Sequence, residues 1–180
     1  MEKGKNRTLF RLIASAMLLA AALVLPFLTG QIPQIGSMLC PMHLPVLLCG
    51  FICGPLYGFV VGLIAPLLRF VLFGMPPLLP TGIPMCFELA AYGLSAGLFY
   101  RLFPKKAPFL YLSLILSMLV GRAVWGIAKL VLYNMTGSEF GWAAFMTGAF
   151  VQALPGILAQ LFLVPILVLA LKKAFPDTVS

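Results

Sequence analysis

The chain has 180 residues, of which 62% are hydrophobic and only 9% are charged. Soluble domains carry about 25% charged residues, so this composition excludes a sizeable water-soluble domain and indicates a protein dissolved in lipid. The formal net charge is +8, but the basic residues stand at the ends of apolar stretches. That placement is typical of membrane topology and argues against nucleic-acid binding.

The N-terminal part of the chain predicts three spans. Residues 9–28 form an apolar stretch of about 30 Å as a helix, enough to cross the hydrocarbon core. This stretch is too long for a signal peptide and no cleavage site follows it, so we expect it to be retained. After a loop at residues 29–42, the Gly54-Pro55 breaker divides a second span at residues 43–53, beginning in the preceding loop, from a third at residues 56–73.

The C-terminal part predicts three more spans, at residues 85–103, 109–133 and 144–171. The Pro-rich segment at residues 74–84 cannot be regular helix, and a second polar loop is expected at residues 134–141. Pro155 and Pro165 should bend or interrupt the last span. The predicted fold class is an all-α integral membrane protein, a single domain of six transmembrane helices over residues 1–180.

Charge placement predicts the orientation. Nine of the twelve basic residues fall on one side of a six-span topology: Lys3, Lys5, Arg7, Arg11, Arg101, Lys105, Lys106, Lys172 and Lys173. The loops of the other side, at residues 29–42, 74–84 and 134–141, contain no Lys or Arg. The positive-inside rule therefore predicts that both termini face the cytoplasm.

Apart from the nine basic residues near the cytoplasmic ends, four charged residues fall inside the predicted spans: Arg69, Glu88, Arg122 and Lys129. Because a charge at mid-bilayer costs about 2.5–3.5 kcal/mol even on insertion scales, such residues usually serve a site or an ion pair. All four lie in the central-to-outer part of the membrane. Three polar residues lie at similar or shallower depth: His43, Asn134 and Gln152. The asymmetry predicts a polar pocket that opens to the outside.

Three cations against one carboxylate suit a ligand with a carboxylate or phosphate group, because arginine presents a planar fork to such anions. Glu88 is expected to pair with Arg122 or Arg69, and Tyr92 and Trp125 could supply apolar walls. The alternatives are that Glu88 and one arginine form a purely structural pair and that Lys129 extends to the outer surface. His43 could equally be a polar residue where a loop meets a helix.

No motif in the sequence predicts an enzyme. There is no nucleotide-binding G-x-x-x-x-G-K-[ST] loop and no hydrolase or metalloprotease signature. Cys49 and Cys53 lie one helical turn apart, but apolar neighbours favour buried small side chains over a metal site. Cys40 and Cys86 add no further pattern. We therefore expect no catalytic residue, no metal and no cofactor.

The chain resembles the substrate-binding S-components of energy-coupling factor (ECF) vitamin transporters. The first span carries Ala16-x-x-x-Ala20, which places two small residues on one helix face. An Ala-x-x-x-Ala face at this position is how S-components dock on their coupling subunit, although the pair could also pack against the protein's own helices. The stretches most similar to the pantothenate subgroup are GSMLCPMHLPVLLCGFICGPLYGFVVGLIAPLLR, GMPPLLPTGIPMCFELAAYGLSAGLFYR and LVGRAVWG.

The resemblance implies a binding subunit in the cell membrane of a prokaryote. It would capture a small water-soluble vitamin from outside, and its partners would be a membrane-embedded coupling subunit and two ATPases. The positions that it assigns to the pocket or its lid are Met42, His43, Pro45, Arg69, Pro84, Glu88, Tyr92 and Arg122. Pantothenate and folate are both anions, so charge does not separate them. A stand-alone secondary transporter, a channel and a lipid-modifying enzyme are the other classes considered.

Overall fold

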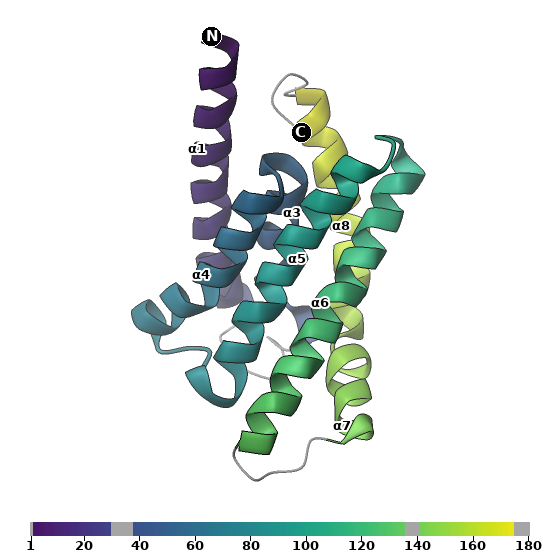
Figure 1. Cartoon of the computed structure of the whole chain (residues 1–180). Coiled ribbons are helices and arrows are strands. Elements are labelled where there is room, and N and C mark those ends of the chain that lie inside the picture. The colour runs from purple at the N-terminus through teal and green to yellow at the C-terminus, as the bar shows by residue number, and fades with distance from the viewer. Residues whose placement is uncertain (1, 30–37, 136–140, 175–180) are drawn as a thin grey trace.

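The computed structural model describes residues 2–29, 38–135 and 141–174, and for residues 2–5 the backbone alone. These parts are helical and contain no strand, which confirms the predicted all-α class (Figure 1). The helices are α1 (Glu2–Val24), α3 (His43–Cys53), α4 (Pro55–Phe73), α5 (Ile83–Leu102), α6 (Ala107–Met135), α7 (Trp142–Met146) and α8 (Leu154–Ala174). Short helical turns occupy Leu25–Thr29, Leu78–Gly82 and Thr147–Val151.

A helix occupies each of the six predicted spans, but the second of these helices is shorter than the membrane is thick. Five segments are long and apolar enough to cross a membrane: Asn6–Leu28, Pro55–Phe73, Leu78–Leu102, Ala107–Met135 and Leu154–Ala174. The second predicted span, α3, has only 11 residues, or about 16 Å, roughly half of the hydrocarbon thickness. Its apolar sequence reflects burial inside the protein, since every residue from Pro45 to Cys53 is buried.

The sixth predicted span is not one helix over residues 144–171. It is divided into α7, the turn Thr147–Val151 and α8, with the break directly after Val151. Pro155 follows this break as the second residue of α8, where a proline is tolerated because its missing N–H needs no partner. Pro165 lies inside α8 without ending it. The Pro-rich segment after α4 is not regular helix, as predicted: Leu79 is extended with φ −115° and ψ 136°, and α5 begins at Ile83.

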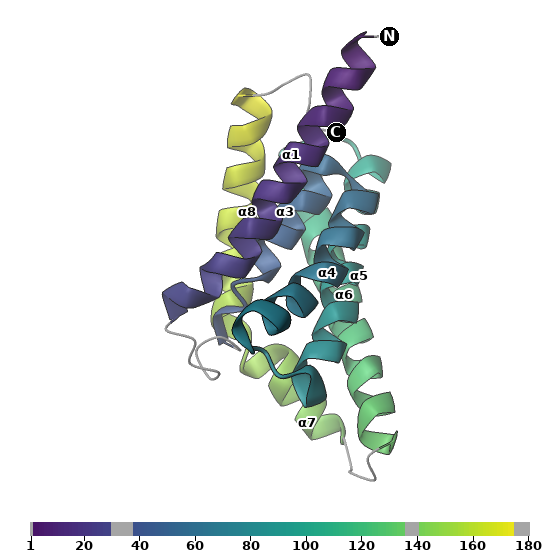
Figure 2. The same ribbon diagram turned by 90° about the vertical axis from the view of Figure 1, so that its left-hand side faces the viewer.

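A seam of glycines holds α3, α4 and α5 together. A methyl group added to Gly58 of α4 would lie 2.5 Å from the Gly93 carbonyl oxygen of α5, and one added to Gly93 would lie 2.1 Å from the Gly58 oxygen. A methyl group added to Gly50 of α3 would lie 2.5 Å from the same Gly93 oxygen. Small residues at such positions let helix backbones touch, which favours packing in lipid. The three helices form the centre of the bundle, and α1 lies across α3 and α4 (Figure 2).

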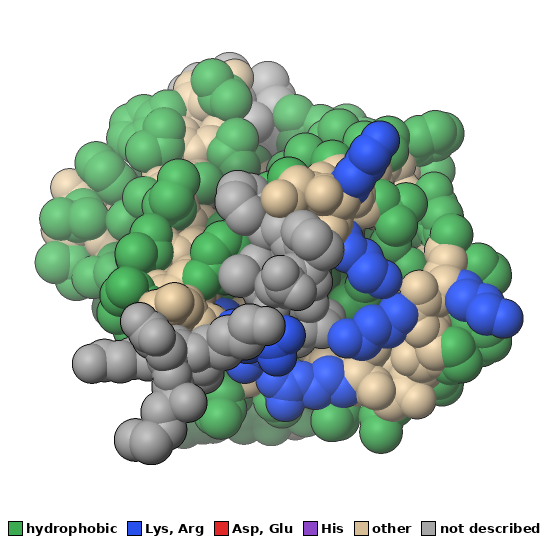
Figure 3. Space-filling model, turned by 90° about the horizontal axis from the view of Figure 1, so that it is seen from above, with side chains coloured by type: hydrophobic (Ala, Val, Ile, Leu, Met, Phe, Trp, Pro, Cys, Tyr) green, Lys and Arg blue, Asp and Glu red, His purple; other side chains and the backbone are tan. Residues whose placement is uncertain are grey.

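The two ends of the bundle differ in charge. The chain enters through α1 and leaves through α8 at the same end (Figure 1). Seen from that end, lysine and arginine side chains gather between apolar ones, and no acidic side chain is visible there (Figure 3). The positive-inside rule predicts that this end faces the cytoplasm. We call it the basic end, and the opposite one the outer end.

Candidate ligand-binding site

A buried ion pair occupies the middle of the bundle, where α3, α5 and α6 meet. The Arg122 Nη1 atom of α6 lies 2.9 Å from the Glu88 Oε1 atom of α5, and the His43 Nε2 atom at the start of α3 lies 3.3 Å from the same oxygen. Glu88 is 2% exposed and Arg122 6%. Arg122 stands near the middle of the long helix α6. The pairing that the sequence left open is therefore Glu88 with Arg122.

Tyr92 covers one side of this pair. It lies one turn after Glu88 on α5, is completely buried, and meets the His43 ring edge to face at 5.1 Å. The aromatic ring fits there because α6 has a glycine opposite: a methyl group on Gly121 would lie 2.6 Å from two ring carbons of Tyr92. The glycine next to Arg122 thus brings the tyrosine ring beside the arginine.

Two residues that the sequence did not indicate also contact this cluster. They are Cys40, in the segment before α3, and Gln160 of α8. Cys40 has a left-handed backbone with φ 47°, and its Sγ atom accepts a hydrogen bond from Arg122 Nη2 at 3.5 Å. Its carbonyl accepts hydrogen bonds from the His43 backbone N–H at 3.0 Å and from Gln160 Nε2 of α8 at 3.5 Å. Non-helical backbone at this depth is tolerated in a membrane protein where protein covers it or where it lines a cavity.

Several buried polar atoms of the cluster lack a hydrogen bond within the described residues. They are both ring nitrogens of His43, the Glu88 Oε1 atom, the Tyr92 hydroxyl and the Arg122 Nε atom. The His43 Nε2 atom still has the ion-pair contact with Glu88. The Tyr92 hydroxyl interacts electrostatically with Arg122 and Glu88, but outside regular hydrogen-bond geometry. Buried polar groups are normally satisfied. Hydrogen-bonding capacity around this ion pair is therefore unused within the described residues.

Lys129 extends the polar line toward the outer end of α6. It is 9% exposed and lies two turns after Arg122 on the same face. Its Nζ atom is 5.6 Å from the centre of the Trp125 ring and 5.4 Å from that of Tyr133, within cation–π range. Trp125 in turn packs against Gly148 of the segment between α7 and α8, where an added methyl group would lie 2.8 Å from the indole.

Arg69 lies in a different environment from the cluster. Its guanidinium donates a hydrogen bond from Nη1 to the Leu23 carbonyl. It also stands 4.9 Å from the centre of the Phe27 ring and 5.5 Å from that of Phe73. These contacts tie the end of α4 to the end of α1, so Arg69 is satisfied without an acid.

The other predicted residues divide by exposure. Asn134 and Gln152 are exposed. Met42, Pro45 and Pro84 are buried. Ala16 and Ala20 are exposed on α1, where they are accessible for docking.

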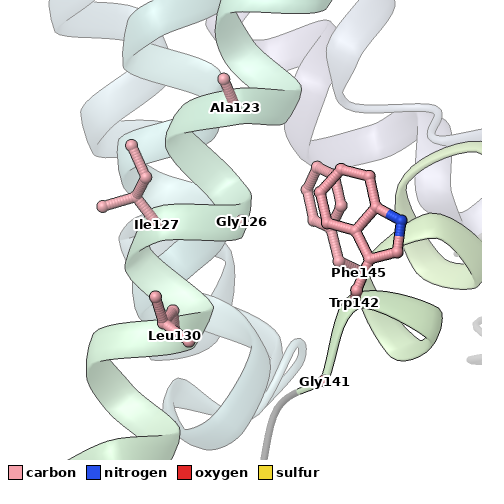
Figure 4. A pocket seen from close by; sticks show the side chains of 7 residues that line it. All are labelled: Ala123, Gly126, Ile127, Leu130, Gly141, Trp142 and Phe145. Carbon is pink, nitrogen blue, oxygen red and sulfur yellow. The ribbon is translucent and has the colours of Figure 1, made fainter.

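An apolar groove lies between α6 and α7. These two helices are on the side of the bundle away from α1 (Figure 1). It encloses about 300 Å³ and is lined by Ala123, Gly126, Ile127, Leu130, Gly141, Trp142 and Phe145. Figure 4 shows the rings of Trp142 and Phe145 facing α6 across it. The Phe145 ring fits against Gly126, where an added methyl group would lie 2.3 Å from a ring carbon. None of these lining residues is charged, so the groove and the polar cluster are separate features.

The comparisons with known proteins agree with this architecture. A family model described as "ECF transporter, substrate-specific component" matches residues 10–168. The searches of curated proteins and of solved structures found no match. Within the described ranges, no three residues among His, Cys, Asp and Glu lie close enough together to hold a metal ion.

Proposed function

Because the chain belongs to the family of substrate-specific components of ECF transporters, we propose that it captures a small water-soluble vitamin with a carboxylate, with pantothenate as the favoured ligand. The vitamin would enter from outside the cell membrane of a prokaryote. It would then pass to a membrane-embedded coupling subunit that works with two ATPases. Folate is the second candidate, because it also carries carboxylates.

The observation that carries the proposal is the uncompensated charge in the interior. Among the described residues, Arg69, Arg122 and Lys129 are buried with Glu88 as the one buried acid, so the interior has a surplus of two positive charges. Arg69 is satisfied by a carbonyl and two rings. Because Glu88 pairs with Arg122, one positive charge then remains, on Lys129 of α6. Burying an unpaired cation is costly, and an anionic ligand would offset that cost.

The arrangement suggests how such a ligand would bind. Its carboxylate would lie between Arg122 and Lys129, where two cations face the same side of α6. Hydroxyl and amide groups of the ligand would meet the Tyr92 hydroxyl and the free His43 nitrogen, which have no protein hydrogen bond. Pantothenate offers a carboxylate, an amide and two hydroxyls in one short chain, and this set matches the atoms that the cluster leaves unsatisfied.

We propose that the coupling subunit docks on the exposed side of α1, which faces away from the rest of the protein. Only 11% of the residues in its apolar stretch are buried inside the protein. Ala16 and Ala20 lie one turn apart on its exposed side. Small residues at this spacing let a second helix approach closely in lipid.

Calorimetric titration of the purified full chain with pantothenate and, separately, with folate tests the ligand. We expect saturable binding of pantothenate that weakens at least about 100-fold in Arg122→Gln, because hydrogen bonds between charged groups contribute about 1.5–3 kcal/mol each and the guanidinium can make two. Lys173→Gln is the matched control, since it removes one positive charge from the distant basic end. Tighter binding of folate would replace the vitamin, and binding that is equal in both variants would refute the site.

A further inference from the structure

Five cations at the basic end lie around one turn of the chain. Lys105 interacts electrostatically with Lys172, Arg101, Arg7 and Arg11. They come from the start of α1, the end of α5, the connection to α6 and the end of α8. We refer to these five residues as the cationic cap. The basic side chains are visible together in the view onto this end (Figure 3).

The floor of the cap is the turn between α3 and α4. Gly54 forms this turn with φ 105°, and the Arg101 Nη2 atom lies where a side chain at Gly54 would stand, 2.5 Å from an added methyl group. Arg11 is within electrostatic reach of Cys53 in the same turn. The two arginines therefore approach one short stretch of backbone from different helices.

The cap lacks sufficient counter-charge. The sequence places nine Lys and Arg residues near this end, and of the chain's four acids only Glu2 and Asp177 are close to it in sequence. Nine cations minus two acids leave at least seven positive charges. The Arg11 Nε atom is buried and has no hydrogen bond within the described chain. Desolvation, followed by repulsion from the neighbouring cations, lowers the pKa of Lys105.

We propose that the cationic cap binds the phosphate of an anionic phospholipid headgroup, with Arg11 and Arg101 as its direct ligands. The site lies at the ends of membrane-crossing helices, where headgroups of the inner leaflet are concentrated. That leaflet is negatively charged, and basic clusters next to spans attract its lipids. Arginine suits the phosphate because its planar fork donates two hydrogen bonds to one group. A phosphate over Gly54 would satisfy the Arg11 Nε atom and relieve the repulsion within the cap.

The acyl chains of the lipid would lie along α1. This helix is the most exposed of the crossing segments, with large apolar side chains facing outward at Leu9, Leu12 and Ile13. A headgroup held at Arg11 would thus leave its chains beside an apolar helix face.

The test titrates a fluorescent phosphatidylglycerol into the full-length protein in neutral detergent, with phosphatidylcholine and inorganic phosphate in separate arms. We expect saturable binding of phosphatidylglycerol, weak binding of phosphatidylcholine and weak binding of free phosphate. Arg11→Gln and Arg101→Gln should each weaken phosphatidylglycerol binding about fivefold or more, since one basic residue near an anionic surface contributes about 1 kcal/mol. Lys106→Gln removes one charge from the same end outside the cap and should have a smaller effect.

Three outcomes would overturn the proposal. Equal weakening by all three variants would show diffuse attraction to negative charge, with no defined site. Equal binding of inorganic phosphate and phosphatidylglycerol would show an anion site that is not specific for lipid. Absence of phosphatidylglycerol binding by the wild-type chain, with the variants losing transport alone, would indicate that an acidic protein partner occupies the cap. Thermal unfolding of each variant shows that a loss of binding is not a loss of fold.

Discussion

The Arg122–Glu88 pair makes a quantitative prediction about stability. Replacing Arg122 with Met leaves the Glu88 carboxylate, which is 2% exposed, without its cation. The remaining neighbour, His43, touches the same oxygen at 3.3 Å and offers at most one hydrogen bond. We expect Arg122→Met to lower the free energy of unfolding, and the second change Glu88→Gln to restore most of the loss.

The magnitude follows from the burial of both partners. Removing one member of a buried pair costs about 3–5 kcal/mol, because the other charge stays desolvated and unpaired. Replacing both members with neutral groups of similar volume is often neutral or stabilising. For a chain of this length, soluble domains shift their melting temperature by about 2–4 °C per kcal/mol. The single variant should therefore melt about 6–20 °C lower than the wild type, and the double variant within a few degrees of it.

Thermal unfolding of the detergent-solubilised chain, followed by tryptophan fluorescence without ligand, measures this cycle. The single variant Glu88→Gln completes it and isolates the coupling between the two side chains. Calorimetry on the same samples separates stability from binding, since the double variant should be stable but should not bind the vitamin. A double variant as unstable as Arg122→Met would refute the reasoning, because Arg122 would then act through packing and not through its charge.

Three further predictions concern packing, docking and the unsatisfied tyrosine. Gly93→Ala should destabilise the chain by about 1–3 kcal/mol through overpacking. Gly141 has open space around it and an ordinary φ of −80°, so Gly141→Ala should leave the melting temperature unchanged. Equal effects of the two variants would contradict the glycine seam. Ala16→Phe with Ala20→Phe should abolish uptake in cells that contain the coupling subunit and ATPases while calorimetric binding persists, and loss of both would indicate misfolding. Tyr92→Phe removes a buried hydroxyl without a hydrogen bond, so thermal stability should not fall. The affinity for the vitamin should fall about fivefold, which corresponds to about 1 kcal/mol. Unchanged affinity would place the hydroxyl outside the ligand site.

The sequence indicated which charged residues lie inside helical spans, but not all of their neighbours. Arg122 and Glu88 could be found because a charge inside an apolar stretch is conspicuous at any position. Cys40 and Gln160 could not be paired from the sequence, because they are 120 residues apart and their contact depends on where the segment before α3 folds. Gln160 alone carried a signal, as a polar side chain within the last apolar span.

The short length of the second span has a related cause. An apolar run of 11 residues is compatible with part of a membrane crossing or with a helix buried in protein, and periodicity alone does not separate the two. The Gly54-Pro55 turn correctly marked the end of α3. The position of its start inside the bundle depends on tertiary contacts of His43 with Glu88 and Tyr92.

The short helix α3 also forms an apolar barrier inside the protein. From Val46 to Cys53 it presents only apolar side chains and glycine, all of them buried, between the polar cluster and the basic end. An anion that moved along this path would lose its hydration over about 12 Å with no dipole or charge from α3 side chains to replace it. On the proposed function, a captured carboxylate could pass along α3 to the far side only if this apolar helix moved or turned relative to the membrane.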